Sequence, residues 1–270
     1  MDSCHQWLTC SDVENVEVKE IIGIGAVKVV YRATWEGFKV AYSKLNNPAY
    51  IADFIHGLNM LRMLHPTKHI VQLIGFCNDD IILTEYHKYG NAVNITDKLT
   101  TSTIQMRLTL CLNYALILQY LHNSPIGTRV MCDSNDISKL LSQFLITEHM
   151  ELLLNDVDAL PEVNLKMNQS IKCGHRELIG TFVAPEQLWP FLHEFHDEEM
   201  PGYDEKTDIW KAASVCDYFL GNISGSDVVR YNLFSVHKLC KSIKPEMRPS
   251  AADLVMEYQR VLDEIQSNDL

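Results

Sequence analysis

Residues 17–45 read EVKEIIGIGAVKVVYRATWEGFKVAYSKL and decide the fold of the N-terminal part of the chain. Valine, isoleucine and tyrosine recur here at alternating positions, and glycines separate the runs. A period of two is typical of strands that bury one face, and breaks that contain glycine are typical of hairpin turns. We therefore predict three antiparallel strands, over residues 17–22, 27–34 and 39–44.

The pattern changes after the third predicted strand. Apolar residues next recur at helical spacing, two short apolar runs follow, and helical patterns dominate from residue 90 onwards. Ser250 and Asp253 are placed as a capping pair at the start of the last helix. The further elements that we predict are a helix over 50–64, strands over 71–77 and 81–86, and helices over 107–121 and 250–265.

Five strands with one helix, followed by a mostly helical remainder, predict an α+β protein with two lobes and a cleft between them. We expect an N-lobe of about residues 1–87 and a C-lobe of about residues 88–270, as parts of one domain over residues 1–270.

Composition excludes several other classes of protein. The chain has 270 residues, of which 47% are apolar, and 23 Lys and Arg against 35 Asp and Glu give a net charge of −12. A chain this acidic is a poor candidate for binding nucleic acid through its overall field, although a local basic groove is still allowed. The longest apolar run, residues 108–121, contains Asn113 and Gln119 and is too short and too polar to span a bilayer.

The cysteines and the sequons bear on the cellular compartment. None of the eight cysteines forms a CxxC pair, so we do not expect a zinc site. Asn-x-Ser/Thr sequons begin at Asn94, Asn168 and Asn222, which are candidate glycosylation sites. They favour a secretory compartment, where some of the thiols would be paired, over a chain that holds only a few buried thiols.

One glycine-rich segment is a candidate functional motif. Residues 23–30, GIGAVKVV, fit the pattern G-x-G-x-x-G-x-V with Lys28 in the place of the third glycine. The segment lies between two predicted strands, unlike a dinucleotide-binding turn, which joins a strand to a helix. Further short motifs follow in order at 40–43 (VAYS), 65–66 (HP), 70–75 (IVQLIG), 84–86 (TEY), 120–122 (YLH), 131–133 (MCD), 155–158 (NDVD), 180–181 (GT), 184–186 (APE), 208–210 (DIW) and 248–250 (RPS).

These motifs cover about residues 17–262, and through their order and spacing the chain resembles the protein-kinase superfamily. Residues 130–136 (VMCDSND), 172–178 (KCGHREL) and 182–190 (FVAPEQLWP) look more narrowly like the protein O-mannose kinases. The resemblance implies a bilobal protein-kinase-like fold, with a five-stranded antiparallel N-lobe that carries one main helix and a mostly helical C-lobe.

The resemblance also implies a function. It predicts an ATP-dependent kinase that phosphorylates the 6-hydroxyl of O-linked mannose in a GalNAc-GlcNAc-mannose trisaccharide on dystroglycan. Members of this family are single-pass membrane proteins with a luminal kinase domain, so this chain would be that domain, on the lumen side of the endoplasmic reticulum, without its anchor. The alternative is a pseudokinase, a scaffold or binding module of the secretory pathway.

Carried over residue by residue, the resemblance assigns the acidic groups. Asp133 occupies the place of the catalytic-loop Asp, which accepts the proton of the substrate hydroxyl. Asp156 occupies the slot of the Asp that binds Mg²⁺ or Mn²⁺. The apolar run 144–146 puts Gln143 in the place of the second metal ligand, in a loop that is about five residues longer than usual. Asn135 or Asp136 remain alternatives for that ligand.

The lysine that kinases carry on the third strand is missing. Strand alternation places Ala41 and Ser43 on the cleft side and leaves Lys44 on the other side, as a solvated residue. We expect Lys28, in the loop that covers the phosphates, to replace it, with an exposed turn residue as the alternative. The usual helix Glu falls on Gly57, so the partner of Lys28 stays open. The implied ATP-binding residues are Gly23, Gly25, Lys28, Val30, Ala41, Glu85 and Tyr86.

Other departures concern the segments around the site. Met131 and Cys132 replace the His-Arg pair before Asp133, and because that Arg normally contacts a phosphorylated activation loop, we expect a site that needs no activating phosphorylation. Cys132 and Cys173 either form a disulfide that fixes the activation segment or are two unrelated buried thiols.

Four further residues are assigned to the neighbourhood of the site or to the framework of the C-lobe. Asp158 is expected to be a solvated turn residue rather than a further metal ligand. Glu186 should pair with Arg248, and Asp208 should cap backbone amides of the catalytic loop.

Overall fold

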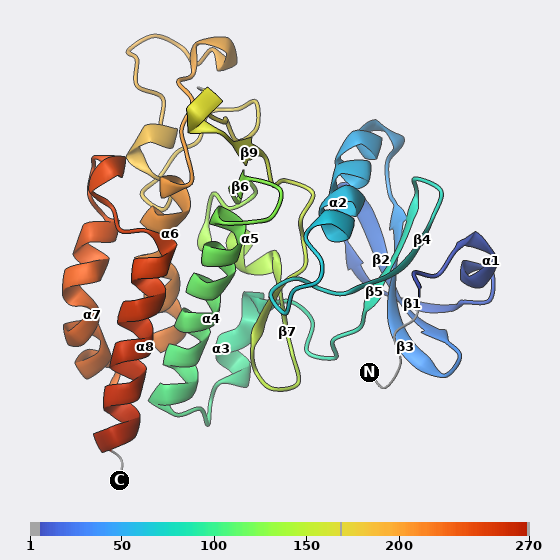
Figure 1. Cartoon of the computed structure of the whole chain (residues 1–270), viewed down its shortest axis with the longest axis horizontal. Coiled ribbons are helices and arrows are strands. Elements are labelled where there is room, and N and C mark those ends of the chain that lie inside the picture. The colour runs from blue at the N-terminus through green and yellow to red at the C-terminus, as the bar shows by residue number, and fades with distance from the viewer. Residues whose placement is uncertain (1–5, 168, 269–270) are drawn as a thin grey trace. The chain divides into compact units, whose positions relative to one another are not determined.

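The computed structural model describes residues 6–167 and 169–268 (Figure 1). The chain divides into two compact units, residues 1–88 with 154–159, and residues 89–153 with 160–270. The short segment 154–159 therefore belongs to the first unit, although it comes late in the chain.

The first unit is built on the five predicted strands, which form one antiparallel sheet in the order β1-β2-β3-β5-β4. The predicted strands and the predicted helix over residues 50–64 are confirmed to within two residues at each end. The elements are α1 (Cys10–Val13), β1 (Glu17–Ile24), β2 (Lys28–Trp35), β3 (Phe38–Leu45), α2 (Ile51–Met63), β4 (Leu73–Cys77) and β5 (Ile81–Glu85).

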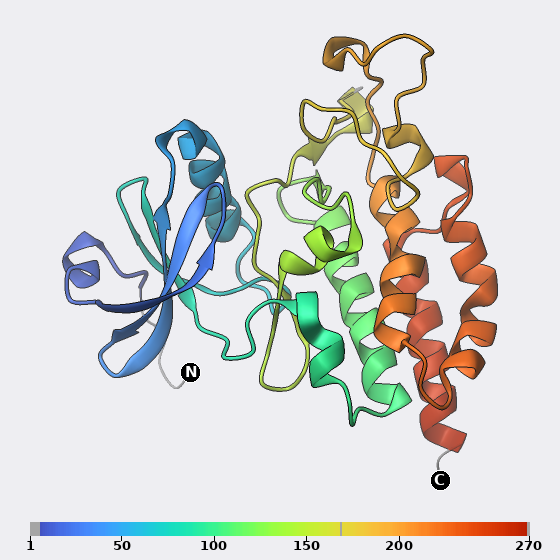
Figure 2. The ribbon, with the colours of Figure 1, turned by 180° about the vertical axis from the view of Figure 1, so that it is seen from behind.

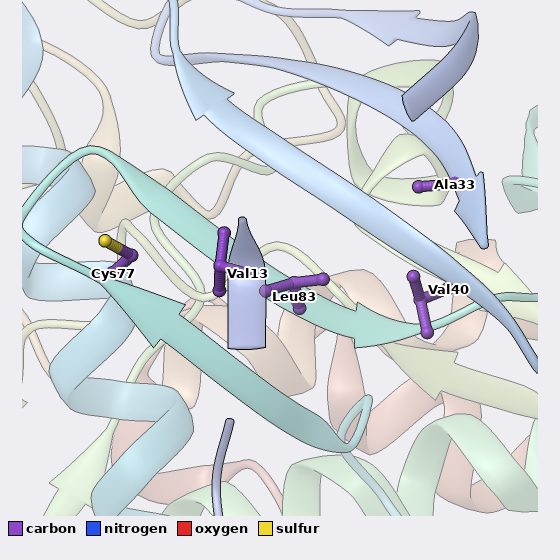
Figure 3. Packing of buried hydrophobic residues seen from close by; sticks show 5 residues of the cluster. All are labelled: Val13, Ala33, Val40, Cys77 and Leu83. Atoms are coloured by element: carbon purple, nitrogen blue, oxygen red, sulfur yellow. The ribbon is translucent and has the colours of Figure 1, made fainter. Parts of the chain in front are cut away.

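One face of this sheet is closed by its own small core. Ala33, Val40 and Leu83 are buried on three adjacent strands, and Val13 of α1 packs on them (Figure 3). A disulfide from Cys10 to Cys77 attaches α1 to β4. Since side chains alternate along a strand, the residues between these core positions face the other side of the sheet, where the predicted nucleotide-binding residues of the first three strands lie.

A segment before α1 also pairs with the sheet edge. Leu8 donates its N–H to the carbonyl of Ile74 at 2.9 Å and accepts from the N–H of Phe76 at 3.1 Å. A Cβ at Gly75 would lie 2.5 Å from the Cβ of Leu8, so only glycine allows this approach. The pairing covers what would otherwise be an open edge of β4.

The second unit is mostly helical. Helix α4 packs against α6 and α8, and α7 packs against the same two helices (Figure 2). The predicted terminal helix begins as expected, because Ser250 and Asp253 exchange hydrogen bonds at its start. The elements are α3 (Ile95–Lys98), α4 (Ile104–His122), β6 (Thr128–Arg129), α5 (Ile137–Ser142), β7 (Phe144–Ile146), β8 (Leu152–Leu154), β9 (Glu162–Val163), α6 (Lys206–Leu220), α7 (Ser226–Cys240) and α8 (Ala251–Asn268).

Two further disulfides lie in the second unit. Cys111 of α4 is bonded to Cys216 of α6, and Cys132 is bonded to Cys173. Cys240 is a buried free thiol. Three disulfides are typical of proteins that fold in the oxidising compartments of the secretory pathway. Within the part of the chain that the structure describes, no helix is both long enough and apolar enough to traverse a bilayer.

The Cys111–Cys216 bond closes a loop of 105 residues between the two central helices. Replacing both cysteines with alanine should lower the free energy of unfolding by about 2–5 kcal/mol, because the unfolded chain regains the entropy that the long loop had removed. Urea unfolding of the oxidised proteins measures this difference. Cys240→Ala is the matched control, since it removes a buried sulfur without a crosslink and should cost about 1 kcal/mol. Equal losses in the two variants would contradict the prediction.

Candidate active site

The glycine-rich turn between β1 and β2 is held closed by backbone and side-chain hydrogen bonds. The N–H of Gly25 donates to the carbonyl of Lys28 at 2.9 Å. The Asn46 side-chain amide donates to the carbonyl of Gly25 at 2.8 Å, and the Asn46 N–H donates to Val27 at the same distance. The turn therefore has a defined shape, and Lys28 follows directly as the first residue of β2.

The predicted nucleotide-binding residues of the first three strands share one face of the sheet. Gly23 lies opposite Val30, and Val30 lies opposite Ser43. Residues two apart on a strand face the same way, so Lys28 and Ala41 are on this face too. It is the face away from the core that contains Val40. This face also carries Arg32, which lies opposite Ala41 and pairs with Glu20. Lys28 is the cation at the turn end of the face.

Lys28 has two acidic partners. Its Nζ donates to Asp156 Oδ1 at 2.7 Å and lies 3.7 Å from Asp158 Oδ2. The side chains of Lys28 and Asp156 are about one-fifth exposed, and that of Asp158 is 11% exposed. Burial disfavours the ammonium, but the two carboxylates outweigh burial and raise the pKa of Lys28 above its usual value.

The expectation that Asp158 is a solvated turn residue was wrong, because its carboxylate is largely buried beside Lys28. The physical reason lies on helix α2. A Cβ at Gly57 would come within 3.2 Å of the Cβ of Asp158. Asp158 thus occupies the space next to the helix position where kinases carry the Glu partner of their lysine, and it supplies the carboxylate from a different element.

The other strand positions agree with the sequence analysis. Ser43 is buried at the place of the missing strand lysine, and Lys44 is exposed. At the end of β5, Glu85 accepts from the N–H of Gln72 at 2.9 Å and lies 3.4 Å from His87 Nε2. Burial of Glu85 opposes its ionisation, but His87 and Gln72 outweigh burial and hold the pKa of Glu85 below its usual value. Tyr86, the other predicted hinge residue, follows directly after the strand.

Asp133 lies in the second unit, between β6 and α5. Its side chain is 38% exposed, and its Oδ2 lies 2.5 Å from Lys139 Nζ. Lys139 belongs to the additional residues of the enlarged loop, which form helix α5. The Asp136 side chain caps that helix by accepting from the N–H of Lys139 at 2.8 Å. The sequence analysis assigned no role to Lys139, and the signal that would have found it is the Asp136 cap, which starts a helix and fixes where its first turn points.

Gln143 ends helix α5 directly before β7, as the apolar run 144–146 predicted. Its side chain is almost fully buried. The amide Nε2 donates to the carbonyl of Lys139 at 3.0 Å and to Ser142 Oγ at 3.2 Å. These donations orient the side chain and leave its carbonyl oxygen as the atom of the amide that can ligate a metal.

The two expected framework contacts are confirmed. Asp208 Oδ2 accepts from the N–H of Met131 at 3.1 Å and lies 3.2 Å from His122 Nε2. Arg248 donates to both carboxylate oxygens of Glu186, at 2.5 and 2.8 Å. Such paired donations from one guanidinium are strong and directional, so they fix the segment that contains Glu186.

Of the alternatives for Cys132 and Cys173, the structure contains the disulfide. The N–H of Cys173 also donates to the hydroxyl of Tyr203 at 2.6 Å. The residue before Asp133 is therefore attached covalently to the segment 172–178, and no arginine is present at that position to contact a phosphate.

The sequons fall in different surroundings. Asn222 is exposed, in the turn between α6 and α7. Asn168 lies outside the residues that the structure describes, and the same holds for the side chain of Asn94.

Comparison with known proteins identifies the family. A family model described as protein tyrosine and serine/threonine kinase matches residues 16–211. Human protein O-mannose kinase is 50% identical over 97% of this chain and 78% of its own length. The Macaca fascicularis and Gallus gallus proteins of the same name are 49% and 47% identical, over 97% and 96% of this chain and 78% and 76% of their own lengths.

These matches confirm the predicted kinase fold, with its five-stranded antiparallel sheet, one main helix and a helical C-terminal region. A kinase domain of this type uses ATP as its phosphate donor. The chain belongs to the protein kinase family of phosphotransferases and, within it, to the protein O-mannose kinases.

Proposed function

We propose that this chain transfers the γ-phosphoryl group of ATP to the 6-hydroxyl of O-linked mannose, in a GalNAc-GlcNAc-mannose trisaccharide on dystroglycan. The observation that carries the proposal is the 50% identity to human protein O-mannose kinase over 97% of the chain. Asp133 and Asp156 give the proposal its chemistry, because a scaffold would not need an acid at either place.

The face of the sheet that points away from the Val40 core is suited to the nucleotide. Val30 and Ala41 offer apolar surface for an adenine ring, and Glu85 and Tyr86 lie where the hinge backbone would pair with it. Gly23 and Gly25 let the backbone of the turn approach the phosphates closely. Lys28 is the cation at that end of the face, and its ammonium stabilises the charge that develops on the phosphate oxygens during transfer.

Asp156 would hold Mg²⁺ or Mn²⁺, with Gln143 as the second ligand. The donor set fits, since both ions prefer hard oxygen ligands and these residues offer a carboxylate and an amide oxygen. A bound divalent ion supplies charge neutralisation on the phosphates. In the structure, Lys28 neutralises Asp156 at 2.7 Å.

Asp133 is the proposed base. Its carboxylate accepts the proton of the attacking hydroxyl and directs a lone pair of that oxygen toward the phosphorus atom. Lys139 Nζ lies 2.5 Å from Asp133 Oδ2 and forms an ion pair with this carboxylate. The side chain is accessible to an acceptor, because more than one-third of its surface is exposed.

The place of action follows from the same family membership. We propose a location on the lumen side of the endoplasmic reticulum, for a protein anchored by a single membrane span, with glycans on Asn94, Asn168 and Asn222. The three disulfides support an oxidising compartment, and Asn222 is accessible to a glycosyltransferase.

Lys28→Met should lower kcat by about 10²-fold or more, since it removes one preorganised positive group from the transferring phosphate. Asp158→Asn should have a smaller effect, because Asp156 still holds the ammonium. Lys44→Met is the matched control and should leave kcat unchanged, since Lys44 is an exposed lysine of the neighbouring strand. Steady-state kinetics with varied ATP measures all three. Equal losses for Lys28→Met and Lys44→Met would exclude the assigned role of Lys28.

The function itself is tested by transfer of labelled phosphate from ATP, with Mg²⁺ or Mn²⁺, to the O-mannosyl trisaccharide. Free mannose and a generic protein substrate serve as other acceptors. We expect transfer to the trisaccharide alone, and Asp133→Asn should reduce it by about 10²–10⁴-fold. Asp227→Asn, at a fully exposed position of α7, is the control and should be fully active. A folded chain that transfers phosphate to no acceptor would be a scaffold instead.

A further inference from the structure

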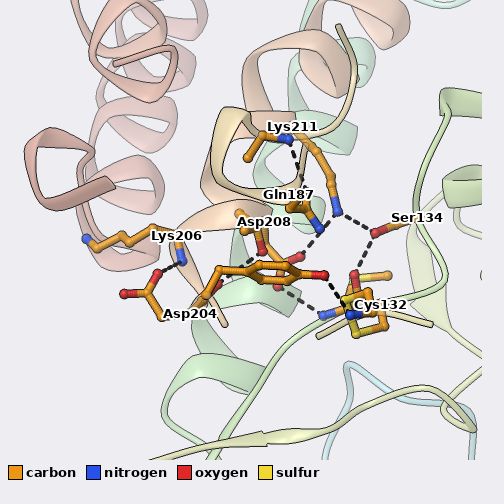
Figure 4. Close-up of polar contacts among 12 residues, drawn as sticks. Cys132, Ser134, Gln187, Asp204, Lys206, Asp208 and Lys211 are labelled. Carbon is orange, nitrogen blue, oxygen red and sulfur yellow. Dashed lines mark hydrogen bonds and ion pairs between the residues drawn. A yellow bond between two sulfur atoms is a disulfide. The ribbon is translucent and has the colours of Figure 1, made fainter. Parts of the chain in front are cut away.

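The turn that carries Asp133 is hydrogen-bonded on both sides of that residue (Figure 4). Ser134 donates its N–H to the carbonyl of Cys132 at 2.7 Å and its hydroxyl to the carbonyl of Met131 at 2.6 Å. Ser134 is fully buried, whereas the Asp133 side chain is 38% exposed. The turn therefore directs Asp133 outward and its neighbour Ser134 into the second unit.

A lysine of helix α6 contacts this turn. Lys211 Nζ donates to Ser134 Oγ at 2.6 Å, and Figure 4 shows the two side chains pointing toward one another. Because the Ser134 hydroxyl in turn donates to the carbonyl of Met131, one chain of hydrogen bonds runs from the Lys211 ammonium to the backbone before Asp133. Lys211 is 1% exposed, so its surroundings leave it little freedom to move.

The acidic neighbour of Lys211, Asp208, does not by itself explain why the Lys211 ammonium is buried here. Lys211 Nζ lies 3.9 Å from Asp208 Oδ1, beyond hydrogen-bond distance, and that oxygen has no hydrogen-bond partner in the described structure. Asp208 instead directs Oδ2 at the N–H of Met131. Burial lowers the pKa of Lys211, while Asp208 and Glu186 act in the opposite direction. The short contact of Lys211 is with the catalytic loop.

We propose that Lys211 is a positioning residue for phosphoryl transfer. Through Ser134 it holds the turn at Met131–Ser134, so that the Asp133 carboxylate is presented in one orientation. The inference rests on the proposed function, in which Asp133 is the base. Asp208 on Met131 and the Cys132–Cys173 bond hold the same turn from two other sides, so the turn is fixed at three points.

Lys211→Met and Ser134→Ala, singly and together, test this role through kcat and KM on the trisaccharide. Each should lower kcat by about 10–10²-fold, because a small misplacement of a reacting group costs that much, while KM for ATP stays unchanged. Since both residues act through one hydrogen bond, the double variant should lose no more than the worse single variant.

Arg107→Met is the matched control. Arg107 is another buried cation of the second unit, 6% exposed, and it donates to the carbonyls of Phe219 and Leu220 at the far end of α6. It should lower Tm without changing kcat at a temperature well below the transition. Hydrogen exchange gives a second readout, since the amide of Ser134 should lose protection in Lys211→Met and keep it in Arg107→Met.

The outcomes separate the two proposals. If Lys211→Met or Ser134→Ala keeps wild-type activity, the inference is wrong and the proposed function stands. The same holds if the loss of kcat parallels the loss of Tm in every variant, Arg107→Met included. A wild-type chain that transfers phosphate to no acceptor overturns the proposed function, and the inference with it. If Lys211→Met does not fold, Ser134→Ala decides, because it breaks the link and keeps the ammonium.

Discussion

The ammonium of Lys28 and the two carboxylates around it, Asp156 and Asp158, set the arrangement of the first unit. A lysine with one-fifth of its surface exposed needs opposite charge close by, since desolvation would otherwise favour its neutral form. Asp156 supplies that charge at 2.7 Å. Asp158 takes the space beside Gly57, so helix α2 needs no acid of its own. Three departures from the usual kinase pattern, in the turn, in the third strand and on the helix, thus have one electrostatic cause.

The second unit also contains charged groups that are shielded from water, and there they belong to a buried polar network. Lys211, Asp208 and Ser134 are all within 1% of full burial. Taking charges out of water costs several kcal/mol for each ion, and such pairs often contribute less stability than apolar residues of the same size would. The presence of such buried charged groups is better explained by the backbone geometry that they fix than by a gain in stability. Here that geometry is the backbone around Asp133, which hydrogen bonds approach from Asp208 on one side and from Lys211 on the other.

The sheet and the long helices were predictable because their sequence periods are local. Alternation predicted that Ala41 and Ser43 share one side of β3 and that Lys44 lies on the other, and in the structure Ser43 is buried and Lys44 is exposed. The partners of Lys28 were not predictable in this way. Asp156 and Asp158 lie about 130 residues further on, and only the folded chain shows that a Cβ at Gly57 would meet Asp158.

Lys211 was missed for another reason. It follows Trp210 in a motif that helped to identify the family, in which Asp208 is the residue with an expected role. The available signal was its spacing: three residues after a buried Asp, on a helix whose buried side continues with Ala212 and Val215. A lysine on the apolar side of a helix is unusual, and it indicates a buried partner. The disulfides were a different case. The resemblance placed Cys132 and Cys173 beside the site and so offered that pair as one of two alternatives, whereas the order of eight cysteines does not resolve the other pairings.

The bond between Cys132 and Cys173 also determines when the site acquires its shape. Kinases that order their activation loop with a phosphate can be turned on and off many times, because one enzyme adds the group and another removes it. Disulfides form and persist in oxidising compartments, so the bond from Cys132 to Cys173 is a lasting feature of the folded chain. In such an enzyme the segment is fixed once, when the disulfide forms. The order of this segment therefore does not depend on a second enzyme that adds or removes a phosphate.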